Sequence, residues 1–476
     1  MEKLFKLNQN NTTVRKEVFA GLTTFMTMAY IIALNPNLLT DFGQNGGQPL
    51  WNAVFLATCI SSAIGTVLMA FLANKPFAMA PGMGLNSFFA LVVSNIVSVT
   101  GMTYLQSFQS ALVIIFVEGI IFTILSVFKI REKIVDAIPL GIRHGIAPAI
   151  GLMLLNIGFG SNAGVLSESK DATFYIMRDF FGSLTPIFAK KSMDSSYAQM
   201  VLTVVTVFFG LFLIIVLSHH KVTGSVLFGM LGASALYWAG QAIFLKENPF
   251  ASLQNASFIP PFADLRDMTL LKLDFAGFVQ IGWFTIITLV LTFCIIDMFD
   301  TIGTLVGTAS RAGMLDKDGN MPQMREALLS DAVGTVAGSL TGTSTVTTFV
   351  ESASGVEVGG RTGLTALTTG LLFLACIFLA PIAAIIPAAA TSSALIYVGL
   401  LMLGGLKNIH FDDVAETFPV FLMLIAMPIS GSIGHAIGIG MISYTVICLF
   451  TGRRKEISPL TYIISAIFLI KFFLVV

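Results

Sequence analysis

The hydrophobic positions of the chain fall into long runs that are separated by short polar stretches. Runs of about 17 to 25 residues are long enough to cross the hydrocarbon core of a bilayer as helices. The first half holds seven such runs, near residues 18–35, 51–73, 77–98, 105–128, 139–160, 198–218 and 222–245. The second half holds seven more, near 276–308, 325–341, 344–359, 362–386, 389–406, 417–430 and 432–449. The pattern therefore predicts an all-α polytopic membrane protein with seven spans in each half.

The ends of this span pattern need separate interpretation. As a single helix, residues 417–449 would be about 50 Å long at 1.5 Å per residue, which is too long for one crossing. Gly431 and Gly434 offer a turn, so we divide this stretch into two spans. A polar tail, residues 1–17, precedes the first span. A further apolar segment, 457–475, follows the last span, and the sequence leaves open whether it crosses the membrane or lies on it.

One short passage occurs twice, once in each half. Residues 61–67, SSAIGTV, recur as residues 330–336, SDAVGTV, with five of seven identities at an offset of 269. At the same offset, residues 77–84, FAMAPGMG, fall on residues 346–353, VTTFVESA. Both segments are poor helix formers, because one holds a proline and two glycines in four residues and the other a β-branched run. Interrupted apolar segments at corresponding positions of two halves indicate a transporter's binding site. We therefore expect short β-strands and half-helices in spans 3 and 10.

Composition supports the membrane assignment and excludes several functions. Hydrophobic residues make up 55% of the chain and charged residues only 11%, whereas about a quarter of an ordinary soluble domain is charged. The net charge is zero, so nothing indicates nucleic acid as a partner. The sequence lacks a nucleotide-binding loop and a nucleophile–base motif, which argues against an ATP-driven pump or an enzyme. We expect no cofactor and no metal, because all cysteines lie in apolar runs without ligand spacing, at Cys59, Cys294, Cys376 and Cys448.

Lysine and arginine in the short loops predict the orientation, because cytoplasmic loops carry an excess of both. In the first half they fall on alternate loops, at Lys3, Lys6, Arg15 and Lys16, then Lys75, then Lys129, Arg131 and Lys133, then Lys221. In the second half they continue at Arg311, Lys317 and Arg325, then Arg361, then Lys407, then Arg453, Arg454 and Lys455. We therefore expect a cytoplasmic N-terminus. An odd number of spans per half also inserts the second half upside down, as in inverted-repeat secondary transporters.

Few ionisable residues lie inside the predicted spans, and each costs about 2.5 to 3.5 kcal/mol at a helix centre on insertion scales. Asp297 and Asp300 are one helical turn apart and share a face, and Glu351 directly follows the β-branched run. In one interpretation, Asp300 caps a broken helix and Glu351 forms a dipole pair at a helix N-terminus. In the other, these two carboxyls meet at the midplane and bind the substrate. We interpret Glu118 as a satisfied interior carboxyl near the end of span 4, and Asp331 as a first-turn helix residue.

The ligand of such a site is predicted from its hydrogen-bonding groups. Half-helices that begin near Gly82 and Glu351 expose backbone N–H groups, and the extended stretches before them expose N–H and C=O groups. Carboxylates accept bonds from ring N–H groups, and a protonated carboxyl donates one. A flat, neutral heterocycle satisfies these groups, with Phe77, Phe88 and Phe349 available to cover its faces. An anion would need arginine or lysine nearby, and we expect none inside these segments.

Five motifs are spread over the whole chain, namely AGLTTFMTMAY at 20–30, APGMGLN at 80–86, DTIGTL at 300–305, TTFVES at 347–352 and GGRTGL at 359–364. At these residues the chain resembles the AzgA-like purine permeases, within the wider nucleobase-cation symporter group. The resemblance implies a 7+7 inverted-repeat transporter with two domains. The core domain would hold spans 1–4 and 8–11, in residues 18–128 and 276–386. The gate domain would hold spans 5–7 and 12–14, in residues 139–245 and 389–449.

The resemblance also implies purine uptake coupled to protons, with Asp300 and Glu351 as ligands of the base. We assign proton coupling to the same two residues. His435 stands where this family suggests a small or uncharged polar residue, and it is either an exposed loop histidine or a proton-sensitive group of the gate. The expected substrate-binding residues are Phe77, Ala80, Gly82, Met83, Asp300, Thr304, Phe349, Val350, Glu351 and Ser352.

We therefore predict a plasma-membrane protein, surrounded by lipid, that imports hypoxanthine, guanine or adenine with protons by alternating access. The sequence leaves a homodimer open. One alternative is a uracil or xanthine carrier on the same fold. The other is an anion channel or exchanger of related architecture.

Overall fold

Helices make up most of the chain, and their order follows the predicted spans. The structure is a computed structural model, and it describes residues 1–41, 43–128, 139–159, 197–254, 256–311, 313–314, 321–409, 412–430 and 433–474. Four of the basic residues that entered the prediction of orientation lie outside the described residues, namely Lys129, Arg131, Lys133 and Lys317.

The first half begins with a short helix, α1 (Glu2–Phe5), in the polar tail. Thr13 caps the next helix, which starts at Val14, four residues before the predicted span. The membrane-length elements are α2 (Val14–Met28) with α3 (Ile31–Thr40), α4 (Gly47–Leu68) with η1 (Met69–Ala73), β1 (Met79–Pro81) with α5 (Met83–Thr100), α6 (Tyr104–Val127), α8 (Leu140–Phe159), α12 (Tyr197–His219), and α13 (Ser225–Gly240) with η2 (Gln241–Leu245).

The two halves are joined by η3 (Ala251–Leu253), α14 (Phe262–Met268) and α15 (Phe275–Gln280). The second half contains α16 (Trp283–Arg311), α17 (Met324–Thr341), β2 (Val346–Thr348) with α18 (Ser352–Glu357), α19 (Gly363–Ala375) with η4 (Cys376–Leu379) and α20 (Ala380–Ala384), α21 (Ala388–Met402) with η5 (Leu403–Asn408), α22 (Val414–Ser430), α23 (Ile433–Phe450), η6 (Arg454–Glu456) and α24 (Pro459–Leu474).

The predicted spans correspond to these elements. Among the described residues, 10 helices are long and apolar enough to cross a membrane. The remaining four predicted spans hold α17, β2 with α18, α22, and α23. The stretch 417–449 therefore holds two helices, as predicted; Gly431 lies outside the described residues, and Gly434 lies within α23. The predicted span 276–308 begins too early, because Gly282 adopts the left-handed backbone (φ 93°) and separates α15 from α16.

Two short strands confirm the interruptions predicted in spans 3 and 10. They pair antiparallel, with Met79 opposite Thr348 and Pro81 opposite Val346. Met79 and Thr348 are also 269 positions apart, which is the offset of the sequence repeat. When a segment pairs antiparallel with its own repeat, and equivalent residues face each other, the two segments are related by a two-fold axis. In an inverted-repeat transporter such an axis lies in the plane of the membrane.

The repeated glycines lie beside the same pair of strands. A methyl group at Gly334 on α17 would lie 3.4 Å from the Cα atom of Gly65 on α4. The small residues therefore let these two helices approach closely behind the strands. The repeated threonines fix the strands: the hydroxyl of Thr66 donates to the Met79 carbonyl (3.0 Å), and that of Thr335 donates to the Val346 carbonyl (3.1 Å).

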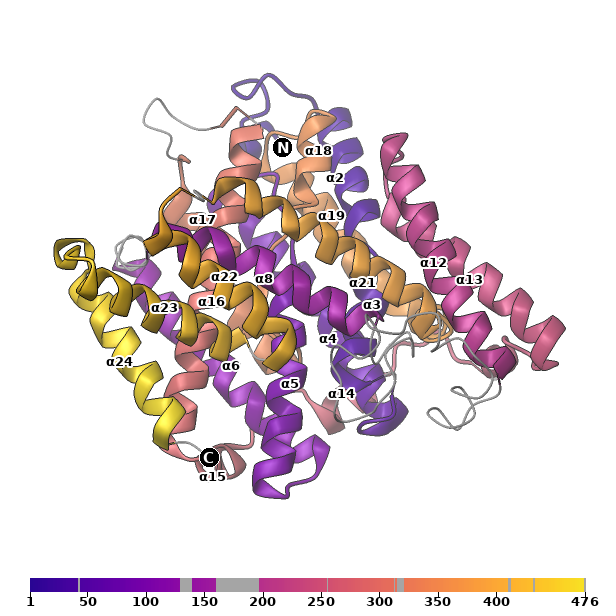
Figure 1. Cartoon of the computed structure of the whole chain (residues 1–476). Helices are drawn as coiled ribbons and strands as arrows, with labels where there is room; N and C mark the ends of the chain where they lie inside the picture. Colours follow the sequence, from indigo (N-terminus) through magenta and orange to yellow (C-terminus); the bar gives the residue numbers. More distant parts are fainter. Residues whose placement is uncertain are drawn as a thin grey trace.

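The helices pack in two groups. In the first, α17 contacts α4 and α6, and α19 contacts α2 and α4. In the second, α8 contacts α21 and α22, while α12 contacts α13 and α21. Figure 1 shows α8, α21 and α22 crossing the front of the molecule, α12 and α13 at one edge, and α24 at the opposite edge beside α23.

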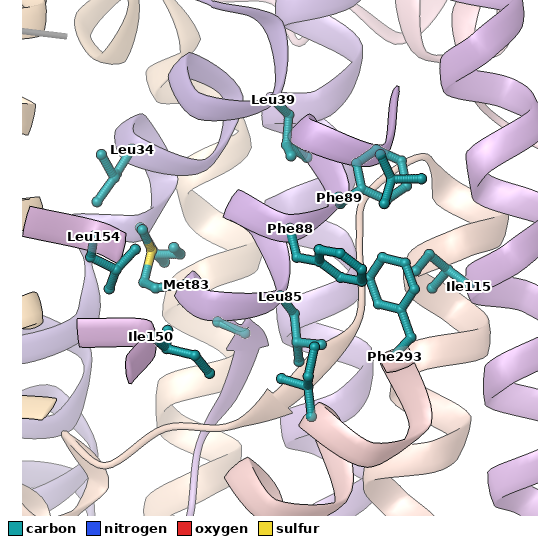
Figure 2. Packing of buried hydrophobic residues seen from close by; sticks show 14 of the residues in the cluster. Leu34, Leu39, Met83, Leu85, Phe88, Phe89, Ile115, Ile150, Leu154 and Phe293 are labelled. Atoms are coloured by element: carbon teal, nitrogen blue, oxygen red, sulfur yellow. The ribbon is translucent and has the colours of Figure 1, made fainter. Parts of the chain in front are cut away.

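The largest buried cluster joins the two groups of helices around the start of α5. Figure 2 shows Met83 between Leu34 of α3 and Ile150 and Leu154 of α8. A methyl group at Gly84 would lie 2.8 Å from Ile150 Cγ2. The first turn of α5 is therefore packed directly against α8, and this contact positions the site described next.

Candidate functional site

The two interrupted spans cross and hydrogen-bond through their free backbone groups. The Gly82 N–H donates to the Thr345 carbonyl (3.1 Å), and the Phe349 N–H donates to the Ala78 carbonyl (3.0 Å). These bonds satisfy backbone groups that a broken membrane helix would otherwise leave without partners. The N-terminal ends of α5, at Gly82, and of α18, at Glu351, follow directly after the crossing. Both helix N-termini therefore lie beside the crossing point.

A cavity of about 320 Å³ lies between the crossing strands and the second group of helices. This volume is at the small end of the range of about 300 to 1,000 Å³ that is usual for small-molecule pockets. One wall is formed by the strands, the starts of α5 and α18, the start of α3, and α16, and it contributes Tyr30, Gly82, Met83, Gly84, Asp300, Thr304, Thr347, Thr348, Phe349, Val350 and Glu351. The second group contributes Arg143, Ile146, Ala147, Ile150, Val398, Leu401, Met402 and Gly405.

The structure brings together most of the residues that the sequence analysis selected. Seven of the ten line the cavity, including both carboxyls. Val350 is exposed to the cavity, with 56% of its surface accessible. Thr348 Oγ1 is buried and, within the described part of the chain, has no hydrogen-bond partner. A polar ligand atom in the cavity could supply that partner.

Glu351 is held by groups on the first membrane helix. The hydroxyl of Tyr30 donates to Glu351 Oε1 at 2.7 Å, and the hydroxyl of Thr27 lies 3.4 Å from the Glu351 carbonyl oxygen. A phenol that donates to a carboxylate restricts its rotamers and leaves the second oxygen of the carboxylate for a ligand. Tyr30 also lines the cavity, although it was not among the residues expected at the site and stands in the sequence only at the end of the motif at 20–30.

A second set of carboxyls lies behind the strands. The hydroxyl of Thr301 lies 3.1 Å from Asp297 Oδ1, 2.9 Å from Asp331 Oδ1 and 2.7 Å from Thr347 Oγ1. Thr347 also lines the cavity. Asp331 is the eighth residue of α17, so its assignment to a first turn is wrong. Its burial in mid-helix is explained by the contact of α17 with β2 and α16.

Glu118 follows its prediction more closely. It lies on α6 and accepts a hydrogen bond from the hydroxyl of Thr345 at 2.8 Å. Asn86 serves the other strand, because its side-chain amide donates to the Pro81 carbonyl at 3.1 Å. Both side chains therefore support the crossing strands from outside the cavity.

Three predicted site residues and one predicted stacking residue do not line the cavity. Phe77 is buried in a cluster with Met69 and Leu305, and Phe88 packs on Phe293 with ring centroids 4.6 Å apart. The remaining two belong to the strand crossing, Ala80 as the partner of Thr347, and Ser352 as the acceptor of the Ala78 N–H at 3.0 Å. Phe349 and Met83 are the predicted apolar residues that do reach the cavity.

The interrupted segments themselves hold no arginine or lysine, as stated from the sequence, but another helix brings a cation to the cavity. Arg143 of α8 lines the cavity, although α8 belongs to a different predicted domain from the carboxyls. The signal was in the sequence, because Arg143 lies inside predicted span 5 and an ionisable residue in a span suggests a functional site. Of the two interpretations of His435, the exposed loop residue is wrong, and the proton-sensitive group of the gate stays a prediction. His435 lies within α23, partly buried, with its ring 5.5 Å from that of Phe472.

The fold and the cavity together define a class of protein. Two interrupted segments, related by the repeat, cross beside a small cavity in a bundle of membrane-length helices, which is the architecture of an inverted-repeat membrane transporter. Among the described residues, no group of three or more His, Cys, Asp or Glu side chains could hold a metal ion.

Comparison with known proteins gives the family. Residues 15–439 match the model of the xanthine/uracil permeases, described as a permease family, and the chain belongs to that family. It is therefore a multi-pass membrane transporter and not an enzyme.

Individual relatives cover almost the whole chain. The adenine permease AdeP of Escherichia coli (strain K12) is 36% identical over 99% of this chain and 95% of its own length. The guanine/hypoxanthine permease PbuO of Bacillus subtilis (strain 168) is 36% identical over 99% of this chain and 100% of its own length. Among solved structures, the transmembrane domain of the cyanobacterial bicarbonate transporter BicA matches with a TM-score of 0.60 at 16% identity, over 90% of this chain and 97% of that chain. This last likeness shows the 7+7 inverted-repeat fold alone.

Proposed function

We propose that this permease imports a purine base by proton symport with alternating access. The observation that carries the proposal is that Asp300 and Glu351, from two different elements, line one cavity of about 320 Å³ together with both helix N-termini. The relatives AdeP and PbuO, which are named for adenine and for guanine and hypoxanthine, support a purine as the substrate.

The groups around the cavity match the polar edge and the faces of a purine. The two carboxyls accept bonds from ring or exocyclic N–H groups, and hydrogen bonds to a charged acceptor are about twice as strong as neutral ones. Phe349 and Met83 offer apolar contact for the faces of the ring. The Thr348 hydroxyl can donate or accept, so it adds one more partner.

We propose that the two groups of helices are the moving parts. The core domain, residues 18–128 and 276–386, holds both strands and both carboxyls. The gate domain, residues 139–245 and 389–449, contributes one face each of α8 and α21 to the cavity. Arg143, Ile146, Ala147 and Ile150 are spaced as one helical face of α8. Val398, Leu401 and Met402 are spaced as one face of α21, and Gly405 of η5 follows them. Movement of these faces of α8 and α21 against the core domain would expose the cavity on alternate sides of the membrane.

In this proposal one cavity carboxyl carries the coupled proton. Accumulation of a substrate against its concentration gradient needs an energy source, and a buried carboxyl that gains and loses a proton in each transport cycle couples accumulation to the proton gradient. Asp300 is the better candidate, because Glu351 is held by the Tyr30 hydroxyl at 2.7 Å. The lysine and arginine residues of the loops support a plasma-membrane protein with a cytoplasmic N-terminus. A homodimer stays a prediction.

Competition of labelled hypoxanthine uptake tests the proposal. The protein is expressed in cells that lack their own purine carriers, and uptake is measured with excess adenine, guanine, xanthine or uracil, with and without a proton ionophore. We expect at least one of adenine and guanine to compete and the ionophore to abolish accumulation. Competition by uracil or xanthine alone would favour the alternative carrier. The position of Arg143 in the cavity lining favours an anion transporter as the second candidate function. Anion currents without proton-coupled purine uptake would refute the proposal.

A further inference from the structure

Arg143 is the one positively charged side chain among the described residues that line the cavity. It lies in the first turn of α8, and its helical face continues through Ile146 and Ile150, which are apolar. The two carboxyls of the cavity come from the opposite wall, on α16 and at the start of α18. The cavity therefore lies between one wall with two carboxyl-bearing residues and another wall with one arginine.

The hydrogen-bonding capacity of these walls is asymmetric. A guanidinium has five N–H donors and no acceptor, and it stays charged at any ordinary pH. An ionised carboxylate has acceptors only. Arg143 also has an interaction within the protein. A ligand that bonds to both walls presents N–H groups toward Asp300 and Glu351 and an acceptor edge toward the N–H groups of Arg143.

The substituent at position 6 of the purine ring decides which purines offer an acceptor edge to Arg143. Guanine and hypoxanthine present O6 and N7 as adjacent acceptors, which is the edge that arginine binds with two parallel hydrogen bonds in nucleic acids. Their N1–H, and the 2-amino group of guanine, remain for the carboxyls. Adenine presents an amino group in place of O6, so a donor would face the donors of Arg143. A site built to bond one group rejects an analogue that lacks it more strongly than an apolar pocket would.

We propose that Arg143 selects 6-oxopurines, guanine or hypoxanthine, over adenine by donating hydrogen bonds to the O6 and N7 edge of the base. This inference rests on the proposed function and deepens it. The relatives leave the choice open, because AdeP and PbuO are equally similar to this chain at 36% identity. Arg143 would make this discrimination from the gate side, so the base would be recognised fully only when α8 closes on the strands.

Equilibrium binding to the purified protein in detergent tests the inference without relying on transport. The ligands are guanine, 6-thioguanine and adenine, and the proteins are wild type, Arg143→Gln and Arg143→Lys. 6-Thioguanine keeps the donors of guanine but replaces O6 by sulfur, a weak acceptor. Arg266→Gln is the matched control, because Arg266 is an exposed arginine, with a side chain 71% accessible, that pairs with Asp267 outside the cavity.

We expect wild type and Arg266→Gln to bind guanine roughly 10- to 100-fold more tightly than 6-thioguanine or adenine, the range for a hydrogen bond to a charged group. In Arg143→Gln the ratio of guanine to 6-thioguanine affinity should fall toward one, with adenine affected less than threefold or so. Arg143→Lys should lie between them, because an ammonium cannot form the two parallel bonds.

Three results separate the possible failures. If wild type binds no purine, the proposed function fails. If purines bind but wild type prefers adenine or does not discriminate guanine from 6-thioguanine, the inference is overturned while the function stands. If Arg143→Gln weakens all three ligands equally, Arg143 only maintains the site, and the inference is also overturned. Should Arg143→Gln not fold, the wild-type ratio and Arg143→Lys still decide.

Discussion

Replacement of Gly82 by alanine should destabilise the protein because of a single steric overlap. The backbone at Gly82 is ordinary and extended (φ −70°, ψ 130°), so any residue can adopt it. A methyl group there, however, would overlap Thr347 Cγ2 of the partner strand and lie 3.5 Å from Asp300 Oδ2. The glycine is thus required for space and not for conformation.

The size of the effect can be estimated from this geometry. An extra methyl group in a well-packed core typically costs about 1 to 3 kcal/mol, and loss of glycine entropy from the unfolded chain returns about 0.4 to 1 kcal/mol. Thr347 cannot easily move, because it pairs with Ala80 and its hydroxyl lies 2.7 Å from that of Thr301. We therefore expect Gly82→Ala to lower the free energy of unfolding by about 1 to 2 kcal/mol. Purine binding should weaken as well.

A second substitution tests the cause. Thr347→Ser removes Cγ2 but keeps the hydroxyl, so Gly82→Ala with Thr347→Ser should recover stability and binding relative to Gly82→Ala. Thermal unfolding in detergent and purine binding measure both. Gly404→Ala is the control, because a methyl group there meets nothing within 4 Å. If the double variant shows only the sum of the single effects, the overlap is not the reason for the glycine.

Three further predictions concern the cavity. Glu351→Gln should weaken purine binding roughly 10- to 100-fold with the fold intact. Tyr30→Phe should weaken it only a few-fold, because this change removes one neutral donor and leaves the carboxyl. Unchanged affinity in Glu351→Gln would exclude Glu351 as a ligand of the base. Asp300→Asn should impair accumulation of purine more than exchange of base for base in proteoliposomes, and equal loss of both would assign Asp300 to binding alone. Val350→Cys should react with a water-soluble thiol reagent, and purine should protect it. Ala80→Cys should not react, because Ala80 is fully buried. Labelling of Val350→Cys that is indifferent to purine would contradict purine binding in this cavity.

Much of the fold followed from the sequence because its signals are local. Apolar length predicted each span, and Pro81 with its neighbouring glycines and the β-branched run before Phe349 predicted where two spans break. The repeat at offset 269 even identified Met79 and Thr348 as equivalent, and they pair in the structure. The bilayer makes such predictions strong, because every backbone group must be satisfied within the protein.

The direction in which each side chain points was less predictable. Phe77 and Phe88 were expected to cover the ligand, but they pack into the protein on the far side of the strands and of α5. Asp331 was assigned to the start of a helix and lies in its middle. A membrane helix that is apolar on all sides gives no periodic signal for which face meets which neighbour.

The sequence by itself determined the class of protein, the seven-plus-seven inverted repeat and the two carboxyl residues that line the cavity. Only the tertiary structure decided what faces those carboxyls. Tyr30 and Arg143 are far from Glu351 along the chain, and they share its cavity because α18 packs on α2 and α8 packs on α5 and α16. Ligand recognition depends on such contacts between distant segments, since donors and acceptors must converge within a few ångströms, and no local pattern in the sequence records that distance.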